Sequence, residues 1–391
     1  MPWPLSRKPA VLLHAEREEP SPAASTRFAF KLFRELDRAG GNLNLFFSPS
    51  GIMLCLALVH ELASGETRKE MQEVLEISSL TRMQLEAEII ALKTAFSERI
   101  NAATTCANSL WLSRQVHLAD GLEARLRTLY NSEISVLDLE SAEALATMND
   151  WVSAKTNGRI TRIVNNPSAL AALVALNAVY FKAAWVDPFK AFLTRDDTFH
   201  LEDGSTKRLP TMTQSGTYRY HEDEQLQAIY LPYQGGIAMY VILPAAKTDL
   251  PAFRQSLKSG WWESLLASLK REEGVIRLPR FKVDYEAQLA EALSSLGMSR
   301  AFDPRRAEFE HLQTERPPVW IDRVLHRAVA DVNEQGTEAA AATMTAVFCG
   351  SAMNPRSRRL FQMTVDRPFL ALIRDESTKA LLFMGWIGDP R

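Results

Sequence analysis

The chain has 391 residues, 46% of them hydrophobic, and its 45 lysines and arginines are nearly balanced by 47 acidic residues. This length supports a sizeable core, and the near-neutral charge argues against nucleic acid or an anionic membrane as the main partner. No apolar stretch approaches a transmembrane span, and the run PAVLLHA after Lys8 is too short for a secretory signal, which favours a cytoplasmic protein.

Helices are expected mainly in the first half of the chain. Residues 25–38 place apolar side chains at helical spacing and stop at two glycines, which predicts an amphipathic helix. Residues 42–59 predict a short strand, a turn at Ser48 and a helix apolar enough to be buried. Two further helices are predicted within residues 61–75 and 140–157.

Strands are expected mainly in the second half. Their residues are apolar and rich in β-branched and aromatic side chains, as in 104–113, 173–185, 228–233, 237–244, 276–285 and two strands within 368–387. One more helix, after residue 285, is closed by Gly297. Helices followed by long strands indicate an α+β fold with largely antiparallel sheets rather than a doubly wound enzyme.

No linker rich in proline, serine or glycine, no internal repeat and no block of charge interrupts the chain. We therefore expect one domain over residues 25–390, preceded by a frayed segment at residues 1–24.

The chain carries no signature of a catalytic or metal site. The motifs GxSxG, HExxH, GxGxxG and the P-loop are all missing from the sequence. Cys55, Cys106 and Cys349 are odd in number and far apart, so they form no disulfide framework or metal-binding spacing. We expect no enzyme activity, no metal and no cofactor, with Cys55 in the core and Cys349 as the one thiol able to react.

Residues 331–353, DVNEQGTEAAAATMTAVFCGSAM, contain almost no large apolar side chain that burial could hold in place. A surface helix with Thr337 as its N-cap is one interpretation, because alanine favours helices. In the other, an extended chain puts Thr337, Ala339 and Ala341 on one small, uncharged face that could enter a sheet. The residue pattern alone leaves both interpretations open.

The run NEQGTEAAAAT at residues 333–343 resembles the hinge of the serpins, the serine protease inhibitors that carry an exposed reactive loop. Further matches occur in order along the chain: FFSPSGI at 46–52, NSLWL at 108–112, NDWVSAKTNGRI at 149–160, LNAVYFKAAW at 176–185, LPRFKV at 278–283, LSSLGMSRAF at 293–302, VLHRAVADVNEQGTEAAAAT at 324–343 and DRPFLALIRDESTKALLFMGWIGDP at 366–390. The resemblance implies the serpin fold: three mostly antiparallel sheets, eight or nine helices and a reactive-centre loop at about residues 334–360.

The resemblance also implies roles for particular residues. The loop hinge would comprise Glu334, Gly336, Thr337, Ala339 and Ala341. The bond attacked by a protease would join Gly350 to Ser351, with Cys349 as the neighbouring candidate. The polar region that controls opening of the central sheet, called the shutter, would contain Ser48, Asn177 and His326, and Trp185 would lie at the breach, where the loop enters.

Two positions depart from the family pattern. Gly51 stands where the family usually has a second serine, which implies that one hydrogen bond of the shutter is missing. Met363 replaces a common aromatic residue, and a flexible methionine can fill such a gap.

The resemblance implies that the chain inhibits a serine-type endopeptidase as a suicide substrate, through an acyl-enzyme followed by insertion of the loop into the central sheet. Such insertion is the established behaviour of that family. A small residue at the attacked bond implies an elastase-like or subtilisin-like protease, held by a monomeric inhibitor in a covalent 1:1 complex. The resemblance also leaves an extracellular location open. The alternative is a non-inhibitory serpin that acts as a carrier, a chaperone or a protein-binding module.

Overall fold

The computed structural model describes residues 23–40, 43–97, 102–119, 121–166, 172–314, 319–337 and 360–390. Most of the predicted N-terminal segment and of the reactive-centre loop therefore lies outside the described residues.

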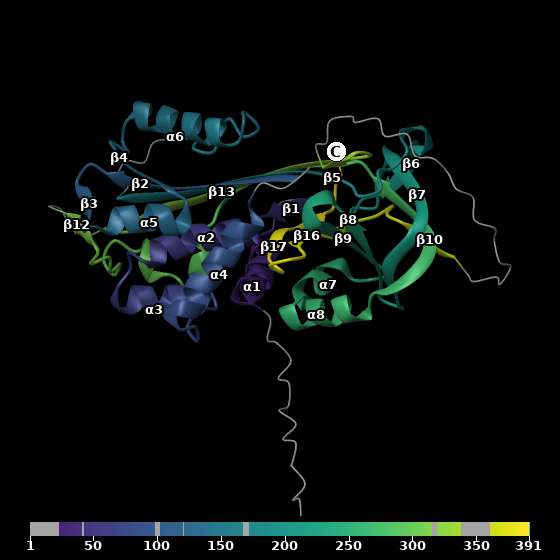
Figure 1. The fold of residues 1–391 in the computed structure, drawn as a ribbon, viewed down its shortest axis with the longest axis horizontal. Coiled ribbons are helices and arrows are strands. Elements are labelled where there is room, and N and C mark those ends of the chain that lie inside the picture. Colours follow the sequence, from purple (N-terminus) through teal and green to yellow (C-terminus); the bar gives the residue numbers. More distant parts are fainter. Residues whose placement is uncertain are drawn as a thin grey trace, which may run out of the picture.

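A six-stranded central sheet crosses the upper half of the molecule (Figure 1). Its strands lie in the order β11-β13-β14-β5-β2-β4. Their bounds are β11 Phe281–Gln288, β13 Ile321–Asn333, β14 Gly336–Thr337, β5 Leu173–Ala184, β2 Ala102–Ser113 and β4 Glu133–Leu137. Strand β5 is buried on both faces, which explains why its sequence is a nearly continuous apolar run.

Helices cover the central sheet on both sides. Helix α6 (Ala142–Lys155) lies above it in Figure 1 and packs Met148 and Val152 against alternate residues of β5. Helix α2 (Pro49–His60) lies below it and is buried along its whole length. Because side chains alternate across a strand, β5 supplies one apolar row to each helix.

The second sheet has nine strands and forms the right-hand part of Figure 1. Its main path runs β1-β17-β16-β9-β8-β7-β10-β15, and β6 pairs with β7. The bounds are β1 Asn44–Phe47, β17 Leu381–Ile387, β16 Phe369–Asp375, β9 Ile237–Pro244, β8 Leu226–Pro232, β7 Thr206–Glu222, β10 Lys270–Pro279, β15 Phe361–Thr364 and β6 Arg195–His200. A two-stranded sheet joins β3 (Val116–Leu118) to β12 (Leu312–Thr314).

Nine α-helices are present in the described part of the chain. Besides α2 and α6 these are α1 Ala24–Ala39, α3 Gly65–Val74, α4 Arg82–Ala95, α5 Leu122–Tyr130, α7 Leu250–Ser256, α8 Ser259–Ser268 and α9 Ala290–Ser295. Three sheets, mostly antiparallel, with nine helices confirm the predicted α+β class.

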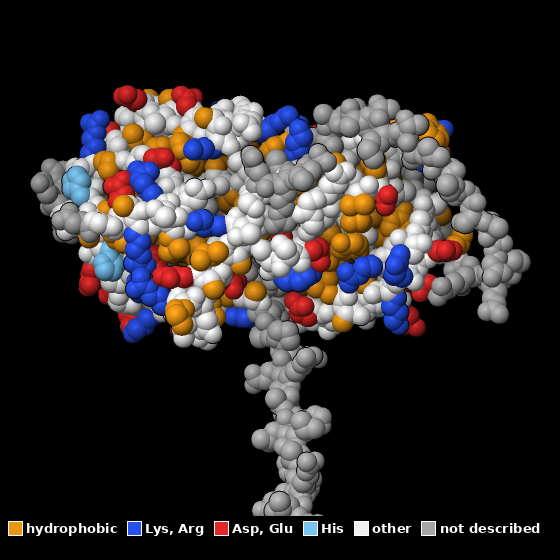
Figure 2. Space-filling model, in the orientation of Figure 1, with side chains coloured by type: hydrophobic (Ala, Val, Ile, Leu, Met, Phe, Trp, Pro, Cys, Tyr) orange, Lys and Arg blue, Asp and Glu red, His pale blue; other side chains and the backbone are white. Residues whose placement is uncertain are grey.

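The face seen in Figure 2 carries basic and acidic side chains interspersed with one another, in keeping with the near-neutral charge of the chain. Within the described residues, no helix is both long and apolar enough to cross a bilayer. The same residues contain no cluster of side chains suited to hold a metal ion.

Candidate functional site

The two described ends of the predicted loop are held in different sheets. On the N-terminal side, β14 belongs to the central sheet, and on the C-terminal side, β15 pairs in parallel with β10 of the second sheet. The predicted residues Ala339, Ala341, Cys349, Gly350 and Ser351 lie between these ends, outside the described residues.

Strand β14 splits the central sheet at one end. Gly336 pairs with Asn333 of β13 on one side and with Ala184 of β5 on the other. Beyond this short wedge, β13 and β5 pair directly with each other in parallel register, as far as Val329 and Tyr180. Gly336 and Thr337, two of the predicted hinge residues, therefore occupy the first two positions of a strand between β13 and β5.

Glycine is required at position 336. Its φ of +147° lies in a region that residues with side chains rarely adopt, and a Cβ would lie 2.0 Å from the Ala183 carbonyl oxygen. The backbone can enter the gap between the two strands only because this residue has no side chain.

Thr337 is fully buried, and its hydroxyl lies 2.7 Å from the Tyr233 hydroxyl. The Tyr233 ring stacks on Trp185 with ring centroids 4.0 Å apart. Trp185 in turn donates its indole N–H to the Asn333 carbonyl at 2.9 Å. Trp185 thus contacts Asn333 directly and Thr337 through Tyr233, a residue for which the sequence predicted no role.

Glu334 is anchored just before the wedge, with 5% of its surface exposed. Its carboxylate accepts two hydrogen bonds from the Arg280 guanidinium, at 2.8 and 2.6 Å, and one from the Thr194 hydroxyl at 2.5 Å. Burial alone would raise the pKa of Glu334, but these donors outweigh burial and hold the pKa below its usual range. Arg280 lies within the quoted LPRFKV motif, yet nothing in the sequence pattern connects it to Glu334.

A second polar group, which we call the central polar cluster, consists of Ser48, Asn108, Asn177 and His326. His326 of β13 and Asn177 of β5 are register partners, and His326 Nδ1 lies 2.7 Å from Asn177 Oδ1. The Ser48 backbone N–H donates to His326 Nε2 at 3.2 Å, so His326 is neutral with its proton on Nδ1. Burial lowers the pKa of His326 to about 3.

Asn108 of β2 completes this cluster by accepting a hydrogen bond from the Asn177 amide at 2.6 Å. The family resemblance implied roles for Ser48, Asn177 and His326 but none for Asn108, although Asn108 lies in the quoted NSLWL motif. The cluster thus connects three adjacent strands of the central sheet, and one of its bonds bridges the strands that β14 separates at their end.

Gly51 lies against the central polar cluster without room for a side chain. A Cβ built there would lie 2.9 Å from both polar side-chain atoms of Asn177 and 2.9 Å from Val179 Cγ2. Ser48 caps helix α2 instead, because its hydroxyl accepts the Gly51 N–H at 3.2 Å. In this chain the Asn177 amide has Asn108 as its partner.

Comparison with known proteins identifies the family. The family model described as serpin (serine protease inhibitor) matches residues 23–390. The chain belongs to the serpin family. An uncharacterized serpin-like protein of Thermococcus kodakarensis is 34% identical over 384 residues, which cover 97% of this chain and 88% of that protein. Mouse antithrombin-III is 30% identical over 380 residues, covering 94% and 81% of the two chains.

Solved structures agree on the fold of this serpin. The native thermophilic serpin tengpin matches with a TM-score of 0.86 at 24% identity, covering 94% of this chain and 93% of that chain. Human thyroxine-binding globulin in complex with its ligand matches with a TM-score of 0.84 at 22% identity, covering 94% and 97%. At these identities the likeness establishes the fold alone.

Proposed function

We propose that this serpin inhibits a serine-type endopeptidase as a suicide substrate. The protease nucleophile attacks a carbonyl of the loop and forms an acyl-enzyme, with the protease attached to the new C-terminus of the loop. The freed loop then extends β14 between β13 and β5 and carries the protease with it before the acyl bond is hydrolysed. The inhibitor contributes no catalytic residue, because all of the chemistry belongs to the protease.

The wedge formed by β14 is the observation that carries this proposal. A strand that continues from Thr337 would place Ala339, Ala341 and Thr343 on the same face as the fully buried Thr337. All of these side chains are small and uncharged, so none would bring an unpaired ion into the sheet. The sequence beyond the wedge therefore suits the position between the strands.

Insertion must also separate contacts that now join β13 and β5. Their direct backbone pairing and the bond between His326 and Asn177 would open, and each inserted residue would gain ladder partners on both sides. A hydrogen bond contributes about 1 kcal/mol net, so exchanging one ladder for two favours the inserted state.

The bond that we propose for attack joins Gly350 to Ser351, with Cys349 as the neighbouring candidate. A small residue at this position fits the shallow specificity pocket of an elastase-like or subtilisin-like protease. Arg356 and Arg358 are trypsin sites further along. Cleavage there would leave too long a tether to distort the protease, so we expect trypsin to cut without being trapped.

The test incubates the protein with elastase-like, subtilisin-like and trypsin-like proteases and examines the products on a denaturing gel. A detergent-stable 1:1 adduct with one of the first two, and a C-terminal fragment whose mass begins at Ser351, would support the proposal. Cleavage by every protease without an adduct would contradict it and favour the alternative of a non-inhibitory carrier. An adduct with trypsin at Arg356 or Arg358 would contradict the proposed bond but not the mechanism.

A further inference from the structure

A cavity of about 350 Å³ lies where the residues after β5 meet β7, β8 and β10, on the right-hand side of Figure 1. Aromatic and aliphatic side chains form most of its wall: Trp185, Phe189, Tyr218, Tyr230, Leu231 and Leu269. This volume is at the lower end of the range for pockets that bind small organic molecules. No residue of the central polar cluster lines it, whereas Trp185 lies both in its wall and against the residues that precede β14.

Two arginines line the same cavity. Arg219 of β7 and Arg271 of β10 are register partners on adjacent antiparallel strands, so their side chains leave the sheet side by side on one face. Neither guanidinium forms a hydrogen bond or an ion pair with any other described residue. Two like charges directly opposite each other destabilise a sheet unless something else neutralises them.

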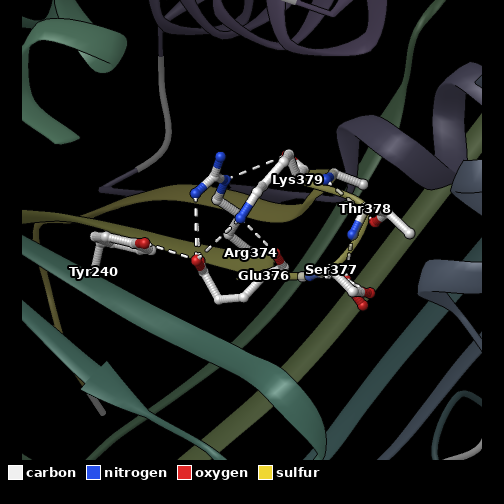
Figure 3. Close-up of polar contacts among 8 residues, drawn as sticks. Tyr240, Arg374, Glu376, Ser377, Thr378 and Lys379 are labelled. Atoms are coloured by element: carbon white, nitrogen blue, oxygen red, sulfur yellow. Dashed lines mark hydrogen bonds and ion pairs between the residues drawn. The ribbon is translucent and has the colours of Figure 1, made fainter. Parts of the chain in front are cut away.

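The arrangement at Arg374 is different. Figure 3 shows the Arg374 guanidinium beside the carboxylate of Glu376, 3.4 Å away, with the Tyr240 hydroxyl donating to the same carboxylate at 2.8 Å. The buried arginine on β16 thus has its counter-charge within the chain. The two arginines at the cavity are exposed, and neither forms an ion pair with Asp187 or any other described residue, so both guanidinium groups are accessible to an anion from solution.

Arg219 lies against the aromatic wall of the cavity. The Arg219 guanidinium lies 5.2 Å from the centre of the Tyr230 ring, which holds it over the aromatic wall. Planar guanidinium groups bind carboxylates with two parallel hydrogen bonds. Asp187 also lines the cavity, so the lining carries two positive charges against one negative.

We propose that this cavity binds a small planar aromatic carboxylate, with the ring against the apolar wall and the carboxylate at Arg219 and Arg271. The site is connected to the hinge through its own wall. Trp185 lines the cavity and donates its indole N–H to the Asn333 carbonyl. Phe189 also lines it, and its backbone N–H donates to the Glu334 carbonyl at 2.9 Å. A ligand that fixes these two residues therefore stabilises the hinge in the position of β14.

The test uses 2-naphthoate as the probe and isothermal titration of the full-length protein. We expect saturable 1:1 binding below about 1 mM, and binding about tenfold weaker for the neutral isostere 2-naphthamide. The double variant Arg219→Gln/Arg271→Gln should weaken naphthoate binding by about tenfold. Lys270→Gln is the matched control, because Lys270 is an exposed neighbour on β10 whose side chain points to the opposite face.

Equal affinity for the acid and the amide would overturn the proposal, as would equal loss in the control variant or no saturable binding by the unmodified protein. The amide comparison needs no variant, so it holds even if the arginine substitutions disturb the sheet. Hydrogen exchange then tests the connection: saturating naphthoate should slow exchange at residues 333–337. Unchanged exchange there, with binding intact, would refute the link to the hinge. Neither measurement uses a protease, so both are independent of the inhibitory proposal.

Discussion

The lack of a side chain at Gly51 leaves room for the buried amide of Asn177 to form its hydrogen bond with Asn108. Asn177 fills the space that a side chain at position 51 would need, and its amide is bonded to Asn108. A polar side chain added beside a satisfied buried network disturbs it, because every displaced donor or acceptor loses its partner.

We therefore expect Gly51→Ser, although it restores the residue usual in the family, to destabilise this protein by about 1–3 kcal/mol. Thermal unfolding measures the change. Gly260→Ser is the matched control, because a Cβ at Gly260 in α8 meets no atom within 4 Å. A melting temperature raised by Gly51→Ser would show that the cluster lacks a hydrogen bond after all.

His326 makes the stability of the native state depend on pH. Burial lowers its pKa from 6.5 to about 3, so the unfolded chain binds a proton at this residue over a range in which the folded protein does not. The resulting contribution to stability is complete above about pH 6.5 and is lost progressively as the pH falls toward 3. His60, with a pKa lowered by burial to about 4, adds to the loss in the same direction.

The prediction is a melting temperature that falls between pH 6.5 and pH 4, and a shallower fall for His326→Gln. The exposed His117 provides the control, and His117→Gln should follow the unmodified protein. If His326→Gln kept the full slope, protonation of His326 would not be the cause.

At the scale of the element, β14 is a strand of only two residues with an unusually complete set of anchors. Thr337 is buried between two strands and bonded to Tyr233, and Glu334 is held by Arg280 and Thr194. A longer β14 would continue from Thr337, so the side chain at position 337 must be accommodated before later residues can pair with β13 and β5.

Thr337→Arg should convert the protein from an inhibitor into a substrate, because a charged side chain would have to be buried without a partner. We expect the fraction of protease found as a detergent-stable adduct to fall by about tenfold or more, with cleavage of the loop preserved. Thr337→Ser keeps the hydroxyl and should leave the adduct largely intact. Undiminished adduct formation by the arginine variant would refute the role of this position.

The long, strongly patterned elements could be predicted from the sequence, and the short ones could not. Residues 173–185 were predicted as a strand, and residues 173–184 form β5. A continuous apolar run of this kind is typical of a strand that is buried on both faces. Strand β14 has no local signal at all, since tertiary pairing alone holds two residues extended. The polar strand β7 was missed for the same reason: it depends on its pairing with β10.

The candidate site likewise contains some residues that could be predicted from the sequence and others that could not. The positions of Glu334, Thr337 and Trp185 came from the family resemblance, and the structure brings them together. Their partners Tyr233, Arg280 and Asn108 could not be predicted, because each is far away in the sequence and becomes a neighbour only through the fold. The residues at the proposed reactive bond lie outside the described part of the chain and stay predictions.

At the scale of the whole molecule, the two described ends of the proposed loop lie in different sheets. Its N-terminal end is β14, between β13 and β5, and its C-terminal end is β15, paired with β10. The loop cannot extend along the central sheet while β15 keeps its place beside β10. In the proposed mechanism, a cut between these two ends removes this constraint and allows the N-terminal portion to pair with both neighbouring strands.

The native arrangement is therefore expected to lie above the cleaved one in free energy. The barrier consists of contacts that close the gap: the direct pairing of β13 with β5 and the bond between His326 and Asn177. Stored free energy of this kind is what a suicide inhibitor needs, because insertion must outrun hydrolysis of the acyl-enzyme.

The most direct measurement is the melting temperature before and after a single cut by subtilisin between Val347 and Met353. The account predicts a rise of roughly 10 °C or more on cutting, and a clearly smaller rise for Thr337→Arg cut in the same way. An unchanged melting temperature, with the β13–β5 amides exchanging as in the uncut protein, would contradict the claim that the cut loop enters the central sheet.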